Sequence, residues 1–376
     1  MHMEKIFIEN CCEILDSMRI PITAENREKG PYPYYGANGI QDYVADYIFN
    51  DELVLLAEDG GNFGSKDKPI AYRVSGKCWV NNHAHVLKPK SGLNVDYLCY
   101  SLMFYKTDGM VNGATRQKLT QAAMRKMKIP FIPMDEQLNV VHKLNKITKI
   151  KEQREKELKL LDDIIRARFI EQFGDPKLND KKWNSGILTD YYEVKGGKRI
   201  PKGMGYADGV TAHPYLRAMD MKNATIIDDN IQYIENEVFE HIKKYTVKAG
   251  EVYLTNVGVN LGMAGVIPEK YDGANLTENA VKLISKMENV IDGTFLAYYI
   301  NSPGIQNYID ERKMSVGVPK LAIFRIETMP LLLPPLDLQR QFVDFVRQVN
   351  KSKVKVQKAL DETQKLFDSL MQQYFG

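Results

Sequence analysis

The sequence predicts a chain of class α/β (α+β), in which two globular domains lie in tandem and each is followed by a long helix. Two observations lead to this prediction. Short segments recur in the same order in both halves of the chain, and each half ends in a segment with the alternating three- and four-residue apolar spacing of a coiled coil. The two long helices are therefore expected to pair with each other.

Composition excludes several classes of protein. The 376 residues are 44% hydrophobic and 26% charged, with a net charge of only +3, which does not suit a protein that holds nucleic acid by bulk charge alone. The four cysteines, Cys11, Cys12, Cys78 and Cys99, lie in the first third without CxxC spacing, which favours a reducing compartment. We find neither a signal segment nor the roughly 18 consecutive apolar residues of a membrane helix. We expect a cytoplasmic protein with no membrane partner.

The clearest repeated segment combines prolines with an acidic and an amide residue. "IPFIPMDEQL" covers residues 129–138, and "MPLLLPPLDL" covers residues 329–338 and is followed by Gln339. Gln137 and Gln339 are 202 positions apart. Proline is tolerated at or before a first helical turn, and an aspartate can cap the free amides there, so each copy predicts a helix start with Asp135 as a cap in the first.

Further matches extend the repeat over the whole chain. "GATRQKL" (113–119) matches "SVGVPKL" (315–321), Ala84 matches Ala280, and "DELVLL" (51–56) matches "GEVYLT" (250–255) at an offset of 199. "RIP" occurs at 19–21 and at 199–201. Their order is collinear and their offsets drift as insertions would cause, so we infer two diverged copies of one unit, about 1–174 and 175–376.

Within each copy the elements differ in period. Short β-rich runs such as "EVYLTNVGV" and "YIFNDELVLLA" lie between Gly, Asn and Asp turns, with helical patterns near "VDYLCYSLMFY" and "TFLAYYINSPGIQNYI", which predicts the α/β domains. The predicted seam of the last helix is Phe342, Val346, Val349, Lys353, Val356, Leu360, Thr363, Phe367, Leu370 and Tyr374. The central copy carries the same register, with Phe169 and Phe173 taking over its end. Antiparallel pairing connects the helices without a long return loop, and predicts two domains at the ends of a rod, related by a pseudo-two-fold axis.

These features together resemble the specificity subunit of Type I restriction-modification systems. The resemblance is carried by "IPFIPMDEQ" and "LLLPPLDLQ", and by "GGKRIPKG", "HPYLRAMDM" and "NLTENAVKLI" in the second half. It covers essentially the whole chain, although "DSMRIPIT" in the first half lacks the paired glycines Gly196 and Gly197. It implies a first target-recognition domain over 1–133, a central helical spacer over 134–174, a second target-recognition domain over 175–334 and a distal spacer over 335–376.

The resemblance also implies a function. Such a subunit binds a bipartite double-stranded DNA target, two defined halves around an unspecified spacer, and directs two N6-adenine methyltransferase subunits and the restriction subunits to it. The chain itself is expected to be non-catalytic and to bind no cofactor, whereas S-adenosylmethionine, ATP and Mg²⁺ are implied for the partner subunits. Two other classes remain open: a coiled-coil scaffold whose globular ends bind proteins, and an autonomous type II-like modification or nuclease component.

Motifs of catalysis are weak in this sequence, so no catalytic and no metal-binding residue is predicted. "LPPL" (333–336) lacks the polar residue of an adenine methyltransferase motif, and "EDGGNFGS" (58–65) lacks the spacing and lysine of a P-loop. "EVK" (193–195) is only half of a nuclease metal site. His83 and His85 could share a strand face and hold a metal, but no third ligand is apparent, which favours polar contacts instead.

Candidate DNA contacts follow from hydrogen-bonding chemistry, because Arg and Lys suit guanine and phosphate while Asn suits adenine. In the first half they are Arg19, Asn38, Asn62, Lys66, Asn82, His83, Arg116 and Lys118. In the second half they are Lys198, Arg199, Lys202, Arg217, Asn256, Asn260, Lys313 and Lys320. The repeated Arg-Ile-Pro could equally be a structural turn whose arginine packs on its own domain.

Overall fold

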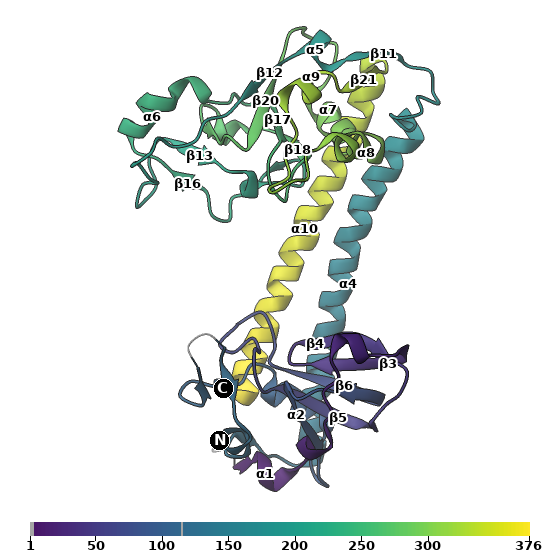
Figure 1. Ribbon diagram of the computed structural model, residues 1–376, viewed down its shortest axis with the longest axis vertical. Coiled ribbons are helices and arrows are strands. Elements are labelled where there is room, and N and C mark those ends of the chain that lie inside the picture. The colour runs from purple at the N-terminus through teal and green to yellow at the C-terminus, as the bar shows by residue number, and fades with distance from the viewer. Residues whose placement is uncertain (1–3, 114–115) are drawn as a thin grey trace. The chain divides into compact units, whose positions relative to one another are not determined.

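The structure is a computed structural model that describes residues 4–113 and 116–376. It divides into two compact units (Figure 1). Unit 1 is Met1–Lys156 with Gln357–Gly376, and unit 2 is Glu157–Val356. The two long helices, α4 (Met134–Phe173) and α10 (Leu336–Phe375), each contribute residues to both units.

Unit 1 is built on a six-stranded sheet of order β2-β7-β5-β6-β3-β4, antiparallel except between β3 and β6. Its strands and helices are β1 (Lys5–Phe7), α1 (Ile8–Cys11), β2 (Cys12–Ile14), β3 (Lys29–Gly36), β4 (Gly39–Val44), β5 (Phe49–Ala57), β6 (Ala71–Val80), β7 (Ala84–Pro89), α2 (Val95–Met103), β8 (Val111–Asn112), β9 (Lys118–Leu119), α3 (Gln121–Arg125) and β10 (Lys128–Pro130). Strand β5 is buried on both faces: Val54 and Leu56 join the core under α2, whereas Leu53 and Leu55 join a second core on the other side. The unbroken apolar run of β5 is thus typical of a strand covered on both faces. All four cysteines are buried in this unit and unpaired.

Unit 2 repeats this plan with a smaller, split sheet. Its elements are β11 (Asn184–Ile187), α5 (Leu188–Tyr191), β12 (Tyr192–Gly196), β13 (Pro214–Leu216), β14 (Met221–Lys222), β15 (Thr225–Ile226), β16 (Gln232–Tyr233), α6 (Asn236–Ile242), β17 (Val252–Thr255), β18 (Ala264–Val266), β19 (Asn275–Leu276), β20 (Ala280–Ser285), α7 (Gly293–Ile300), α8 (Pro303–Arg312), α9 (Ile323–Glu327) and β21 (Pro330–Leu333). Strands β12-β20-β17-β18 form one sheet and β16-β13-β19 another. Central strand β17 again faces two cores, with Val252 and Leu254 on one side and Tyr253 on the other.

The strand ladders prove the internal repeat residue by residue. Phe7 pairs with Lys128 in unit 1, and the positions predicted to match them, Ile187 and Pro330, pair in unit 2. The parallel pairing of β3 with β6, in which Tyr34 pairs with Trp79, recurs as that of β13 with β19, in which Tyr215 pairs with Asn275. Matched pairing partners are a far stricter test than short sequence matches, because a one-residue slip would turn every side chain to the opposite face.

One predicted alignment was wrong by one residue. Leu87 pairs with Val54, and its counterpart Leu283 pairs with Val252, so β5 and β17 match at an offset of 198 rather than 199. The offset of 199 would have aligned inward-facing positions of β5 with positions that face the opposite core. The sequence allowed both, because both strands are apolar on both faces.

Helices α4 and α10 run antiparallel within each unit, as predicted. In unit 1, the Lys143 Nζ donates to the Tyr374 hydroxyl at 3.4 Å, while Lys151, two turns further along α4, lies over the earlier ring of Phe367. In unit 2, the Lys353 Nζ contacts the Asp162 carboxylate at 2.5 Å. The predicted seam is largely buried. Phe169 and Phe173, which were expected to close the seam at the end of α4, are both buried. The other buried seam residues are Val140, Leu144, Ile147, Ile165, Phe342, Val346, Val349, Val356 and Phe367.

The repeated proline-rich segment ends in a buried glutamine that ties each helix to its domain. The Gln137 Oε1 accepts from the Asn94 amide at 2.8 Å, and its Nε2 donates to the carbonyls of Gly92 and Ile132. Gln339 makes the same three bonds, to the Asp292 amide and to the Val290 and Pro334 carbonyls. Both glutamine side chains are fully buried, and these bonds pair the oxygen and the nitrogen of each side-chain amide, as buried polar groups require.

The predicted cap was assigned to the wrong residue. Helix α4 begins at Met134, so Asp135 is inside the first turn, where its charge suits the amide end of the helix but where a cap residue cannot lie. Sequence pattern placed the helix start within one residue and missed the glutamine, whose role depends on backbone groups more than 40 residues away.

Candidate nucleic-acid interface

Loops at one end of the unit 1 sheet come together into a surface that we call loop face 1: residues 16–19, 36–39, 58–64, 81–83, 112–113 and 116–118. The Asn38 Nδ2 donates to the Gly60 carbonyl at 3.0 Å, and the backbones of Asp59 and Lys118 form an isolated antiparallel β-bridge. The His83 Nδ1 lies 2.6 Å from the Asp59 carboxylate. Segments separated by up to about 100 residues in the sequence are therefore held as one surface.

Unit 2 carries the equivalent surface, loop face 2: residues 196–203, 217–220, 256–262, 277–279 and 314–320. The backbones of Val257 and Lys320 form an isolated β-bridge, the counterpart of the β-bridge between Asp59 and Lys118. The Gly258 amide donates to the Pro319 carbonyl, and the Asn260 Nδ2 donates to the Ala218 carbonyl. Loop face 2 contains a cavity of about 430 Å³, whose lining includes Arg199, Tyr206, Tyr215, Arg217, Val259 and Glu278.

Most candidate residues of unit 1 lie on or beside loop face 1, in different states. Arg116 and Lys118 are exposed but pair with Asp59 and Glu58 respectively. Arg19 is mostly buried and points into its own domain, which is the structural-turn alternative left open by the sequence. Of the remaining candidates, Asn38, Lys66 and Asn82 are exposed, while Asn62 and His83 are half-buried.

Buried charges in unit 1 form a closed network around Asp16, Glu58 and His85. These three are the described residues whose side chains come close enough together to hold a metal ion, within 4.8 Å. Yet the His85 Nδ1 is 2.7 Å from Asp16 and its Nε2 is 2.9 Å from the Leu119 carbonyl, which can only accept. Arg19 contacts the Glu58 Oε2 at 2.6 Å and the Asp16 Oδ2 at 3.5 Å. The other Glu58 oxygen pairs with Lys118, and the other Asp16 oxygen accepts from the Val86 amide. The groups a metal would need are already engaged by protein partners.

The electrostatics of this network follow from those contacts. Burial raises the pKa of Asp16, but hydrogen bonds from His85, Val86 and Gln121 outweigh it and leave the pKa below its ordinary value. The pKa of Glu58 is likewise lowered, since its hydrogen bonds from Arg19 and Lys118 outweigh burial. Both carboxylates are thus ionised, and His83 and His85 serve different carboxylates rather than one shared site.

Candidate residues of unit 2 divide into exposed cations and internally bound groups. Lys198, Arg199, Lys202 and Lys320 are exposed, whereas Asn260 and Lys313 are half-buried. Arg217 makes a two-pronged contact with Asp220 and a further bond to the Asn230 carbonyl, which holds it against its own domain. Asn256 is buried, and its Oδ1 has no hydrogen-bond partner among the described residues.

Exposed apolar side chains on loop face 2 were missed by the sequence reasoning. Val259 is 99% exposed and Val316 is 98% exposed, and Met219 lies on the same surface at 57%. An isolated valine in a glycine-rich loop has no sequence signal that separates it from a core valine. Such side chains can contact thymine methyl groups, which project into the major groove.

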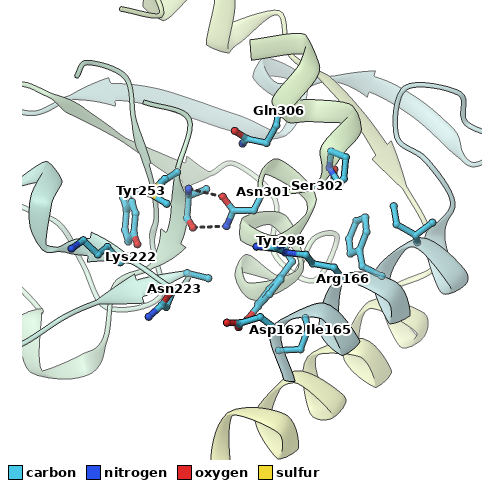
Figure 2. Close-up of a pocket in the computed structure, with 16 residues that line it drawn as sticks. Asp162, Ile165, Arg166, Lys222, Asn223, Tyr253, Tyr298, Asn301, Ser302 and Gln306 are labelled. Carbon is cyan, nitrogen blue, oxygen red and sulfur yellow. Dashed lines mark hydrogen bonds between the residues drawn. The ribbon is translucent and has the colours of Figure 1, made fainter. Parts of the chain in front are cut away.

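A second cavity of unit 2, of about 270 Å³, lies among α4, the β14–β15 turn, β18 and the α7–α8 junction (Figure 2). Figure 2 shows the Asn301 side chain paired through two hydrogen bonds with the backbone of Ala264, which ties α7 to β18. The Ser302 hydroxyl donates to the Tyr299 carbonyl, and the lining contains neither histidine nor cysteine. The wall of this cavity is structural and offers no activated nucleophile.

The comparisons with known proteins agree with this architecture. The family described as type I restriction modification DNA specificity domain matches residues 2–160 and 180–363. A protein of Haemophilus influenzae named as a type I restriction enzyme specificity subunit is 28% identical over 349 residues, covering 90% of this chain and 85% of the relative. The MjaIX specificity subunit of Methanocaldococcus jannaschii is 21% identical, covering 81% of this chain and 74% of that protein.

Solved structures show the same fold. The type I restriction-modification S subunit from M. genitalium superposes with a TM-score of 0.58 at 15% identity, covering 100% of this chain and 97% of that one. A chain from a study of assembly and conformational transition of the type I system gives 0.57 at 14% identity, covering 99% and 97%. Among the described residues, no helix has the length and apolar character needed to cross a membrane.

Proposed function

This chain belongs to the type I restriction-modification DNA specificity family, and from that premise we propose that it is the sequence-recognition subunit of such a complex. In this proposal loop face 1 and loop face 2 each read one half of a bipartite double-stranded DNA target. The observation that supports it most is the ladder-matched repeat, which brings corresponding cations, Lys118 and Lys320, to the same place on both surfaces. Two copies of one reading surface suit a target of two defined halves.

The helical segments would set the distance between the half-sites. Each of the two helices has 40 residues. The buried Gln137 and Gln339 leave little freedom where each helix leaves its domain. A stiff joint of this kind makes binding of the second half-site effectively intramolecular and selective for one spacer length.

Partner subunits would supply the chemistry. We propose that two methyltransferase subunits bind this chain and methylate one adenine N6 per strand, and that restriction subunits join them. Exposed apolar residues on the helices are suitable docking points, including Leu160 and Ile164 on α4 and Val354 and Leu366 on α10. S-adenosylmethionine, ATP and Mg²⁺ would act in those partners, and this chain would place no catalytic group at the DNA.

Mapping of methylated adenines in cells with and without the gene tests the proposal directly. A split motif with one modified adenine on each strand should be present with the gene and absent without it. An unchanged adenine-methylation pattern would overturn the proposal and favour a protein scaffold.

Binding measurements provide the second test. With a net charge of only +3, the isolated chain should bind target DNA weakly at 150 mM salt, and addition of the methyltransferase should raise the affinity strongly. Equal affinity with and without that partner would contradict the proposed division of labour.

A further inference from the structure

The two arginines of the repeated Arg-Ile-Pro segment occupy matching positions but opposite states. The Arg19 side chain is 13% exposed and its Nη1 contacts Glu58 at 2.6 Å and the Ala84 carbonyl at 2.8 Å. The Arg199 side chain is 78% exposed, and its Nε contacts the Glu278 Oε1 at 2.5 Å. The arginine at this position therefore forms buried contacts within its own domain in unit 1 and lies on the surface in unit 2.

The strand ladders explain the difference. In unit 1 His85 pairs with Leu56, and in unit 2 the matching pair is Val281 with Leu254. By the same registers the positions of Asp16 and Glu58 are held in unit 2 by Gly196 and Asn256. Unit 2 thus lacks both carboxylates that hold Arg19, and a guanidinium does not stay buried without an anionic partner.

The backbone also fixes where Arg199 emerges. The Lys198 amide donates to the Leu276 carbonyl, and a Cβ at Gly197 would come within 2.4 Å of that same carbonyl oxygen and 2.1 Å of the Thr277 one. Only glycine permits this close approach, so the loop is held against the strand end that also carries Glu278. Glu278 is held in turn, since Thr277 Oγ1 lies 3.2 Å from its Oε2.

The remaining hydrogen-bonding capacity of this pair is specific. Among the described residues, neither terminal nitrogen of Arg199 has a hydrogen-bond partner. Both nitrogens can therefore donate outward, while the adjacent Glu278 carboxylate, 29% exposed, can accept. A phosphate would meet repulsion from that carboxylate, whereas a base pair that presents two acceptors beside a donor would satisfy both side chains.

We propose that Arg199 and Glu278 act as one reading unit for a single G·C base pair in the half-site bound by unit 2. In the major groove guanine presents O6 and N7 as acceptors, and the paired cytosine presents its N4 amino group as a donor. Arg199 donates to the guanine and Glu278 accepts from the cytosine. This inference rests on the proposed DNA-recognition function and assigns specificity within it to two residues.

The test uses the whole complex with its methyltransferase. Adenine methylation is mapped in cells carrying the wild-type chain, Arg199→Ala or Glu278→Ala. Each variant should keep the first half-sequence and the spacer and lose the requirement for G·C at one position of the second half, and that position should be the same for both. In competition binding to duplexes changed at that position, the wild-type preference of roughly 5- to 150-fold should fall to near unity.

Two controls separate specificity from general weakening. Lys202→Ala removes an exposed cation of the same loop and should weaken binding to all duplexes about equally, as loss of a phosphate contact does. Lys177→Ala removes a cation of an exposed ion pair with Glu311, outside loop face 2, and should leave base preference unchanged.

The outcomes distinguish the inference from the function on which it rests. If the wild-type chain directs no split motif, the proposed function fails. If it does, and Arg199→Ala keeps every base requirement, the inference is wrong. If a variant abolishes methylation altogether, the competition assay on the purified complex decides: loss of preference at one base pair supports the inference, and an even loss across all positions overturns it.

Discussion

Units 1 and 2 share their strand registers and differ in what they place at the ends of those strands. Loop face 1 lies over a buried network of charges, whereas loop face 2 carries exposed valines and a cavity, and Arg199 is exposed there although its counterpart Arg19 is buried. The buried apolar positions and the ladder partners are equivalent in both. One backbone plan is therefore compatible with two quite different surfaces, because folding depends on the strand interiors and the surface chemistry depends on a few loop positions.

The largest expected difference between the units comes from breaking the buried network. Asp16→Ala should destabilise unit 1 by roughly 3–5 kcal/mol. The Asp16 side chain is only 3% exposed, and its removal takes a buried carboxylate away from both His85 and Arg19. Unit 2 has glycine at this position and provides no equivalent.

The chain offers a matched reporter for each unit, because its two tryptophans are Trp79 in unit 1 and Trp183 in unit 2. Denaturant unfolding of Asp16→Ala is followed by Trp79 fluorescence in a Trp183→Phe background, and by Trp183 in a Trp79→Phe background. A loss below about 1 kcal/mol in the Trp79 signal would show that the network contributes little.

The next effect should be equal in the two units. Gln137→Ala and Gln339→Ala each remove three hydrogen bonds and leave a buried cavity, so each should cost about 2–4 kcal/mol in its own unit. The same pair of tryptophan reporters measures both losses. Markedly unequal losses would mean that the two joints are alike in geometry but not in energy.

A smaller contrast should appear on acidification. The pKa values of Asp16 and Glu58 are lowered in the folded state, so the stability that they contribute is fully present above their unfolded values, near 3.8 and 4.5. It is lost as the pH falls from there through the lower folded values. In urea titrations between pH 6 and pH 2.5, the Trp79 transition should therefore weaken more steeply below pH 4.5 than the Trp183 transition.

The control for acidification is Asp16→Asn combined with Glu58→Gln. This variant should be less stable at pH 7, and its Trp79 transition should depend less on pH below 4.5. A Trp79 transition with unchanged pH dependence would assign the acid sensitivity to other carboxylates.

The smallest expected effect concerns the helix pair in unit 2. The Lys353 side chain is 20% exposed and its partner Asp162 is 45% exposed, so Lys353→Met should cost only about 0.5–1 kcal/mol in the Trp183 transition. The loss should shrink further at high salt. A loss above 2 kcal/mol would indicate that this seam lysine is a major determinant of helix pairing.

Much of the fold could be predicted because it depends on periodic signals. The repeat was visible in matching segments, and the strand ladders confirm it. The two long helices and their antiparallel pairing were visible in apolar spacing, and the helix bounds and the contacts between the helices confirm them. The alignment of β5 with β17 was wrong by one residue, since strands buried on both faces carry no alternation to fix the register. The role of Asp135 was also misassigned, because the buried partner of the joint is the glutamine two positions later.

The loop faces were less predictable. The structure brings the segments that the sequence nominated together on the two loop faces. The sequence could not tell the buried Arg19 from the exposed Arg199, because Arg19 is held by Glu58, 39 residues away, and unit 2 has Asn256 at the position of Glu58. The sequence predicted Arg217 and Lys202 alike as DNA contacts, yet the Arg217 guanidinium is hydrogen-bonded to Asp220 within its own domain. Which of these residues touch DNA stays a prediction.

The position of the cysteines has a practical consequence. All four are buried in unit 1, and burial raises the pKa of Cys78 and Cys99 to about 12, which keeps these thiols protonated and slow to react in the closed protein. Alkylation of these two thiols therefore measures how often unit 1 opens. Unit 2 contains no cysteine and does not react with the same reagent. Once the four natural cysteines are replaced, a single cysteine introduced into unit 2 would carry a label without background signal.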